Sequence, residues 1–252
     1  MAAASSSTVS LASSTSVTLR PAQPADAVQL QALQQVIYDE ARWFVGDGPP
    51  SVDMLTRRLR SLDLRHTYYL VALARTEGHM LQGHTLQGRT PRGKPTSKPR
   101  LCGWLELNRP QPLRLRHVAV LTLAVAPEWR GRGVGQHLLA RAYAWAQRTG
   151  VKKIQLDVRS GNSAAIRLYK RQGFVLEGRE RAQIRTSKQS NHYEDNLIMA
   201  KFLDDSLLTA STAYLGCPDL QAPDIQAPDI QAPELQAGEA HHKPISPTSE
   251  SK

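Results

Sequence analysis

The pattern of apolar and polar positions predicts strands and helices between residues 16 and 203. Strands are predicted where residues alternate or are β-branched and aromatic, and helices where apolar residues recur every three to four positions. The predicted strands are 16–20, 67–74, 101–108, 116–126, 153–158, 174–178 and 192–203, and the predicted helices are 25–42, 52–62, 133–149 and 162–171. This order indicates one α/β domain built on a single mixed sheet.

Both ends of the chain and one internal stretch lack this periodicity. Residues 1–15 are mostly Ser, Ala and Thr without a charged side chain, so we expect a short disordered arm. Residues 204–252 hold four copies of a five-residue unit (PDLQA, PDIQA, PDIQA, PELQA). A proline in each copy predicts a disordered, extended acidic tail. Residues 75–100 are basic and rich in Gly and Pro, which predicts an inserted hairpin loop.

The net charge of +10 is the sum of two segments with opposite charge. Residues 204–252 hold eight acidic and two basic side chains, whereas residues 1–203 hold 14 acidic and 30 basic ones, a net of +16. This charge keeps open a nucleic-acid or ribosome-associated binding protein, although we expect nucleic acid to be an unlikely partner.

Cysteine content and hydropathy exclude other classes. Cys102 and Cys217 are too few for a disulfide framework or a multi-cysteine zinc site, and we expect no metal. No apolar run approaches 18 residues, so we expect no membrane-spanning helix and a cytoplasmic protein.

The segment that carries chemistry begins where the strand 116–126 ends. Arg130-Gly-Arg-Gly-Val-Gly135 opens the helix 133–149, and glycines at a helix start let free N–H groups approach a phosphate. No Gly-Lys-Ser/Thr follows, which excludes a P-loop. A dinucleotide site with Asp157 as its acid stays open despite the G-x-G-x-G spacing, as does a glycine-rich helix start that serves packing alone.

A second motif, Asn162-Ser-Ala-Ala-Ile-Arg-Leu-Tyr169, leads to Gly173-Phe174. Together the two motifs resemble the GNAT superfamily of N-acetyltransferases over about 16–203. The resemblance implies a GNAT fold, with six to seven mostly antiparallel strands flanked by about four helices, and acetyl-CoA as co-substrate. Flanking residues around Arg116-His117 and Tyr193-Glu-Asp195 are similar to the branch that acetylates amino acids and other small molecules.

The resemblance also implies roles for individual residues. Tyr169 would protonate the leaving thiolate, and Asn162 would contact the cofactor arm or simply cap its helix. Relatives that acetylate protein lysines often carry a Glu where this chain has Ala119, so a base acting through water is expected. Glu106, His117 and Asp195 are the candidates for that base. The expected cofactor contacts are Leu123, Ala124, Val125, Arg130, Gly131, Arg132, Gly133, Val134, Gly135, Gln136, Asn162 and Tyr169. The expected acceptor-binding residues are Arg116, His117, Tyr193 and Asp195, of which Arg116 and His117 would bind a substrate carboxylate.

These patterns predict an N-acetyltransferase in which a primary amine attacks acetyl-CoA directly in a ternary complex. The expected acceptor is a small molecule such as an amino acid, and a protein N-terminal or lysine acetyltransferase is the alternative. A cofactor sensor without turnover is disfavoured by Tyr169, and a homodimer is left open. The cluster Arg57, Arg58 and Arg60 is interpreted as a solvated helix face.

Overall fold

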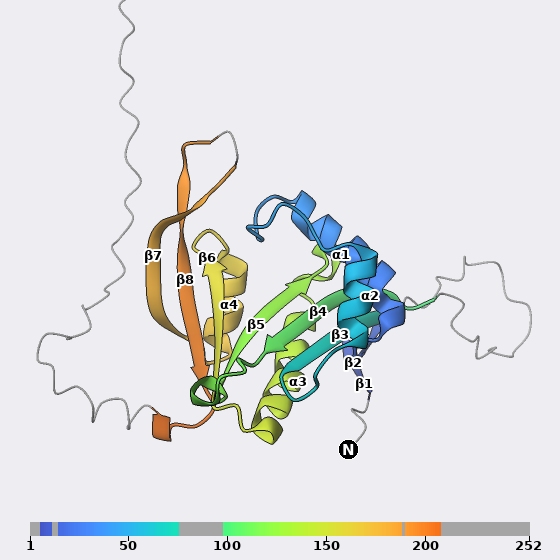
Figure 1. The fold of residues 1–252 in the computed structure, drawn as a ribbon. Coiled ribbons are helices and arrows are strands. Elements are labelled where there is room, and N and C mark those ends of the chain that lie inside the picture. The colour runs from blue at the N-terminus through green and yellow to red at the C-terminus, as the bar shows by residue number, and fades with distance from the viewer. Residues whose placement is uncertain (1–5, 12–14, 76–97, 188–189, 208–252) are drawn as a thin grey trace, which may run out of the picture. The chain divides into compact units, whose positions relative to one another are not determined.

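The computed structural model describes residues 6–11, 15–75, 98–187 and 190–207 (Figure 1). The strands are β1 (Ser7–Leu11), β2 (Thr15–Pro21), β3 (Thr67–Arg75), β4 (Arg100–Asn108), β5 (Val118–Val125), β6 (Lys153–Arg159), β7 (Val175–Arg185) and β8 (Tyr193–Phe202). The helices are α1 (Ala27–Asp39), α2 (Val52–Arg60), α3 (Val134–Thr149) and α4 (Ser163–Arg171), with short 3₁₀ turns η1 (Pro24–Asp26), η2 (Leu113–Leu115) and η3 (Pro127–Trp129).

The described strands form one sheet in the order β1-β2-β3-β4-β5-β6-β8-β7. β5 and β6 run parallel, and the other neighbouring strands in this order are antiparallel. The prediction of a single, mostly antiparallel mixed sheet with about four helices is therefore confirmed. The described sheet has eight strands instead of six to seven because the chain adds β1 at one edge.

The prediction of a disordered arm over residues 1–15 is wrong for Ser7–Leu11, which form β1. This strand pairs antiparallel with β2, and Val9 lies opposite Val17. The hydroxyl groups of Thr8 and Thr18 also lie 3.3 Å apart across the pair. A short Ser- and Thr-rich run has little hydrophobic pattern of its own, so the edge that β2 offers decides its conformation. Residues 1–5 and 12–14 lie outside the described part of the chain.

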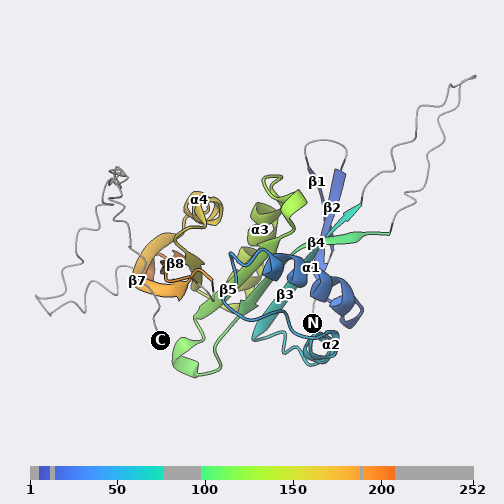
Figure 2. The same ribbon diagram turned by 90° about the horizontal axis from the view of Figure 1, so that it is seen from above.

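Helices cover both faces of the central strands. Tyr68 and Leu70 of β3 pack into one core with α3, whereas Tyr69 and Val71 pack into a second core with α1 and α2. Figure 2 shows α3 and α4 on one side of the sheet and α1 and α2 on the other. Because β3 is buried on both faces, its sequence is almost continuously apolar.

A β-bulge in β4 sets which side chains face each core. The register between β3 and β4 shifts at Cys102, and Gly103 follows it. A Cβ atom at Gly103 would lie only 3.1 Å from the carbonyl oxygen of Ala124, so the close approach of β5 favours glycine there. Beyond the bulge Leu105 faces the α3 core, and by alternation Glu106 faces the side of α1 and α2.

The structure gives closer limits for the inserted loop and for the tail than the sequence pattern does. β3 ends at Arg75 and pairs with β4, which begins at Arg100, as expected for strands joined by an inserted loop. Residues 76–97 of that insertion and residues 208–252 of the repeat tail lie outside the described residues. Asp204, assigned to the tail by the sequence, forms an ion pair with Lys152 at 2.8 Å.

Candidate active site

The sheet opens between β5 and β6. The two strands pair over three positions, Val118 to Val120 on β5. Beyond them β5 stays paired with β4 as far as Val125, and β6 stays paired with β8 as far as Arg159. The strands therefore diverge toward their carboxyl ends (Figure 1). A strand edge that has lost its neighbour offers N–H and C=O groups to an extended ligand.

The glycine-rich turn lies at the start of α3, directly after β5 and η3. Gly131 and Gly133 have φ of +73° and +84°, left-handed values that favour glycine. In α3, His137 N–H donates to the Gly133 carbonyl at 3.1 Å. The N–H groups before His137 point out of the helix end and have no acceptor within it, which suits an anion. They belong to Val134, Gly135 and Gln136.

Gly135 brings the turn, β5 and α4 together. A side chain at this position would lie 3.1 Å from Leu168 Cδ2 of α4 and 3.8 Å from Leu123 Cδ2 of β5. The start of α3 therefore packs closely against α4 beside the diverging strands. This packing gathers the predicted cofactor residues of three separate elements around one opening.

The two arginines of the turn have partners within the chain. The Arg130 guanidinium donates to the Glu40 carboxylate at 2.9 and 2.5 Å and to the Val125 carbonyl at 3.1 Å. The Arg132 guanidinium lies over the Trp129 ring, 5.2 Å from its centroid. Arg132 is exposed at the turn, whereas Arg130 connects the turn to the segment after α1.

Asn162 immediately precedes α4, and Tyr169 lies within that helix. The Asn162 side-chain oxygen accepts the Ala165 N–H at 3.1 Å, so Asn162 serves as a helix N-cap. Tyr169 is buried and packs against Phe174 with ring centroids 5.4 Å apart. Burial raises the pKa of Tyr169, so its hydroxyl keeps its proton at neutral pH.

Glu106 is a buried carboxyl group on β4, opposite Thr122 of β5. Its Oε1 accepts hydrogen bonds from Asn108 Nδ2 at 3.0 Å and from the guanidinium of Arg58. Burial raises the pKa of Glu106, and the positive charge of Arg58 and the Asn108 hydrogen bond oppose that rise. A raised carboxyl pKa is typical of a group that takes up protons in catalysis.

Arg58 is a site residue that sequence reasoning missed. Arg57, Arg58 and Arg60 are exposed, as expected for a solvated helix face, but the Arg58 guanidinium also reaches the buried carboxylate of Glu106. Arg58 lies three residues after Leu55, whose burial marks the face of α2 that meets the sheet. This position could have indicated that Arg58 contacts the sheet. Its partner on β4, however, lies 48 residues away in sequence.

The four predicted acceptor-binding residues lie at two different ends of the sheet. Arg116 and His117 precede β5, at the end where it is paired with β6. Eight residues of extended chain separate His117 from Val125, about 26 Å at roughly 3.3 Å per residue. The structure therefore does not bring Arg116 and His117 to the open end.

Tyr193 and Asp195 lie at the open end, where β8 begins. The Tyr193 hydroxyl accepts a hydrogen bond from Arg185 at 3.2 Å. Asp195 forms an ion pair with Arg179 and accepts the Ala182 N–H at 2.8 Å. The Ala182 hydrogen bond and the Arg179 guanidinium lower the pKa of Asp195. Asp195 therefore braces an irregular point of the β7–β8 pair and is a weak candidate for a base.

Polar side chains also line β6, β8 and β7 beside the opening. Asn196 Nδ2 donates to the Asp157 carboxylate at 3.3 Å and to the Glu180 carboxylate at 2.7 Å. Leu156 and Val158 pack into the core with α3, so alternation turns Asp157 to the opposite face. This is also the face to which Glu106 points.

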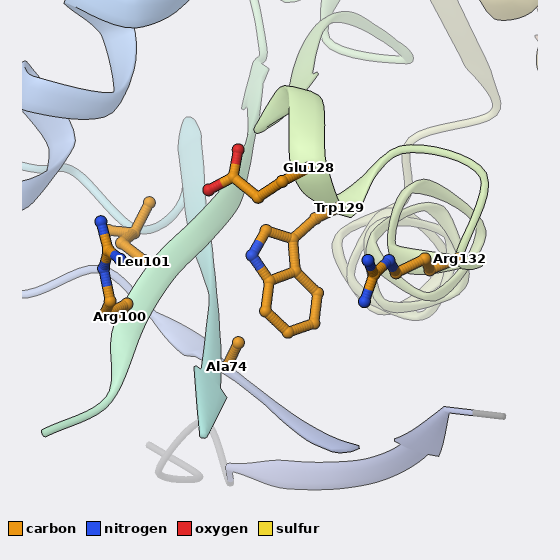
Figure 3. A pocket seen from close by; sticks show the side chains of 6 residues that line it. All are labelled: Ala74, Arg100, Leu101, Glu128, Trp129 and Arg132. Carbon is orange, nitrogen blue, oxygen red and sulfur yellow. The ribbon is translucent and has the colours of Figure 1, made fainter. Parts of the chain in front are cut away.

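A separate small pocket lies between the start of β4 and η3 (Figure 3). Its volume is about 220 Å³, and its lining includes Trp129 from η3, Arg132 from the turn and Arg100 from β4. The lining takes no residue from β6 or α4. This pocket is therefore distinct from the opening between β5 and β6.

Among the described residues, no group of three or more His, Cys, Asp or Glu side chains is placed to hold a metal ion. The helices of the same residues also include none that is both long enough and apolar enough to cross a membrane.

Comparison with known proteins agrees with this geometry. Residues 57–174 match the model of the acetyltransferase (GNAT) family. N-alpha-acetyltransferase RimI of Mycobacterium tuberculosis is 32% identical over 148 residues, which cover 59% of this chain and 75% of that protein. Mycothiol acetyltransferase of Brachybacterium faecium is 32% identical over 90 residues, 35% of this chain but only 27% of that protein. A phosphinothricin acetyltransferase of Sinorhizobium meliloti, solved with AcCoA, has a similar fold, with a TM-score of 0.57 at 21% identity over 75% of this chain and 89% of that one.

An opening between two parallel strands beside a glycine-rich helix start is an arrangement that suits a phosphate-bearing ligand. The similarity to RimI, which extends over three quarters of that relative, identifies the chain as a member of the GNAT family of acetyltransferases. The enzyme class that the two sequence motifs predict, an acetyltransferase, is therefore confirmed.

Proposed function

We propose that this enzyme transfers the acetyl group of acetyl-CoA to the α-amino group of a polypeptide N-terminus, by direct attack in a ternary complex. The observation that carries this proposal is the similarity to an N-alpha-acetyltransferase over 148 residues and 75% of its length. The position of Arg116 and His117 at the far end of β5 removes one reason to expect a free amino acid, the predicted binding of its carboxylate by these two residues.

The described residues fit acetyl-CoA. The unpaired edge of β5 at Leu123, Ala124 and Val125 suits an extended pantetheine arm, which can hydrogen-bond to main-chain groups. The turn from Gly131 to Gln136 presents helix N–H groups to a pyrophosphate. When bound, the cofactor supplies an acetyl group activated as a thioester.

The side chains around the opening suit the remaining steps. The amine nitrogen forms a bond to the acetyl carbon as the carbon–sulfur bond breaks. Glu106 takes up the amine proton, directly or through water, and its raised pKa favours that role. Tyr169 gives its hydroxyl proton to the thiolate. A fixed donor at the developing oxyanion typically contributes about 3 kcal/mol, and Val125 N–H is our candidate.

A small amine is the second candidate acceptor. It is favoured by the similarity to mycothiol acetyltransferase, which this chain matches over 27% of that protein's length. The carboxylates of Asp157 and Glu180, on the face to which Glu106 points, would attract a cationic amine of either kind.

A thiol-release assay with acetyl-CoA tests the proposal. The panel pairs peptides with a free N-terminus against the same peptides with a blocked N-terminus and one lysine, and adds amino acids and polyamines. We expect turnover with the free α-amine, identified as N-terminal acetylation by mass spectrometry, and loss of most turnover in Tyr169→Phe. Turnover with small amines alone would support the second candidate and reject the first.

A further inference from the structure

One ion pair ties the segment between α1 and α2, residues 40–51, to the cofactor turn. Arg130 Nη1 and Nη2 donate to the two carboxylate oxygens of Glu40 at 2.9 and 2.5 Å. The two residues are 90 positions apart in sequence. Trp43 Nε1 donates to the same carboxylate at 2.6 Å, and the guanidinium of Arg130 lies 5.9 Å from the centre of the Trp43 ring. A two-pronged guanidinium–carboxylate pair of this kind fixes orientation as well as distance.

The third nitrogen of the Arg130 guanidinium is also engaged. Arg130 Nε donates to the carbonyl oxygen of Val125 at 3.1 Å, and Val125 is the last residue of β5. All three guanidinium nitrogens therefore bind groups of this chain. Arg130 links the 40–51 segment to the end of the strand that borders the opening.

Aromatic stacking supplies a second anchor for the same segment. The Phe44 ring stacks on Tyr38 of α1 at 5.1 Å and on Trp104 of β4 at 6.0 Å. Between these anchors Ala41 has a φ of +50°, a left-handed value that costs a residue with a side chain about 1–2 kcal/mol. The backbone of the segment thus adopts a conformation that depends on its anchors.

We propose that Glu40 and Arg130 are a positioning pair that holds the 40–51 segment beside the end of β5, where this segment forms the acceptor side of the opening, and that Arg130 does not bind the cofactor phosphates. The proposal rests on the proposed acetyl transfer at this opening. Three of the five N–H donors of Arg130 already bind groups of this chain, and the Glu40 carboxylate offsets its charge, which makes Arg130 a poorer phosphate ligand than a free arginine. Loss of the pair should therefore weaken acceptor binding and leave cofactor binding unchanged.

The variants Glu40→Gln, Arg130→Gln and their combination test this role. The matched control is Glu177→Gln, which breaks the ion pair of Glu177 with Lys153, a pair of similar exposure at the closed end of β6. The readouts are hydrogen exchange of the backbone amides of residues 40–51, the Kd of CoA by calorimetry, and the acceptor KM and kcat.

We expect faster exchange over residues 40–51 in Glu40→Gln and Arg130→Gln and no change there in the control. The acceptor KM should rise about fivefold in both single variants, the size expected for a partly exposed pair, with kcat and the CoA Kd within about twofold. The double variant should be no worse than either single one.

Two outcomes would overturn the proposal. If Arg130→Gln weakens CoA binding about tenfold and Glu40→Gln does not, Arg130 is a phosphate ligand. Unchanged exchange over residues 40–51 in Glu40→Gln would mean that the pair does not order the segment. Exchange and CoA binding need no turnover, so both remain decisive even if the acceptor class proves wrong.

Discussion

Glu106 illustrates how burial and a few neighbours define a reactive side chain. It is 6% exposed on β4, with Arg58 and Asn108 as hydrogen-bond donors. Burial disfavours the charged form and raises the pKa, whereas the Arg58 charge favours the carboxylate. The side chain is active as a base only when deprotonated, so activity is lost as pH falls through this raised pKa.

Replacement of Glu106 tests that role directly. Glu106→Gln keeps the size of the side chain and removes its ability to take up a proton, so kcat should fall about 10²- to 10⁴-fold. The Kd of CoA should stay within about twofold. In the unaltered enzyme the acid limb of the kcat profile should have a midpoint above 4.5, the ordinary pKa of a glutamate.

Arg58→Gln tests the same role by shifting the pKa of Glu106. Without the guanidinium the pKa of Glu106 should rise further, which moves the acid limb of kcat to higher pH. The limb that belongs to the acceptor amine should stay in place, since Arg58 does not contact it in this scheme. If Arg58→Gln left the pH dependence of kcat unchanged, Glu106 would not be the base.

At the scale of elements, the glycine-rich turn and α3 work as a unit. Left-handed backbone at Gly131 and Gly133 aims the first turn of α3 at the opening, and Gly135 lets α4 pack against it. A substitution in the turn can therefore affect both stability and cofactor binding. These two effects are separable because the same helix ends at another left-handed glycine, Gly150, with a φ of +74°.

Gly133→Ala and Gly150→Ala form a matched pair. An alanine would meet only His137 ring atoms at 3.9 Å at position 133 and nothing within 4 Å at position 150. Backbone strain should therefore lower the free energy of unfolding by about 1–2 kcal/mol in each. We expect CoA binding to weaken about tenfold in Gly133→Ala alone, measured by calorimetry beside urea unfolding. Equal CoA affinity in the two variants would show that the turn does not contact the cofactor.

For the whole molecule, the opening is also the place where the sheet is least connected. β5 and β6 share three paired positions, whereas β4 and β5 share six. A ligand that pairs with the free edge of β5 would therefore connect the two halves of the sheet. Its binding energy would add to the stability of the folded state.

CoA should stabilise the protein against heat. At about 100 times its Kd the free energy of unfolding should rise by about 2.7 kcal/mol, as for any ligand specific to the folded state. Hydrogen exchange should slow at Leu121–Val125, where β5 lacks β6. A rise in melting temperature without that protection would place CoA somewhere other than the opening.

Much of the fold could be predicted because its signals are local. The helices, their glycine and asparagine caps, and the strands β3 to β6 follow from periodicity within short segments. β1 could not be predicted, because its Ser- and Thr-rich residues become a strand only beside β2. The bulge at Cys102 likewise reflects the fit of Gly103 against Ala124, a contact between neighbouring strands.

By itself the sequence determined the order of elements from β2 onward, the glycine-rich helix start and the family, since each depends on residues close together in the chain. The tertiary structure alone decided that Arg58 contacts Glu106 and that Arg130 binds Glu40. It also placed Arg116 and His117 away from the open end. Such pairs join segments 48 and 90 residues apart, and no local pattern encodes which distant side chains a fold brings within hydrogen-bonding distance.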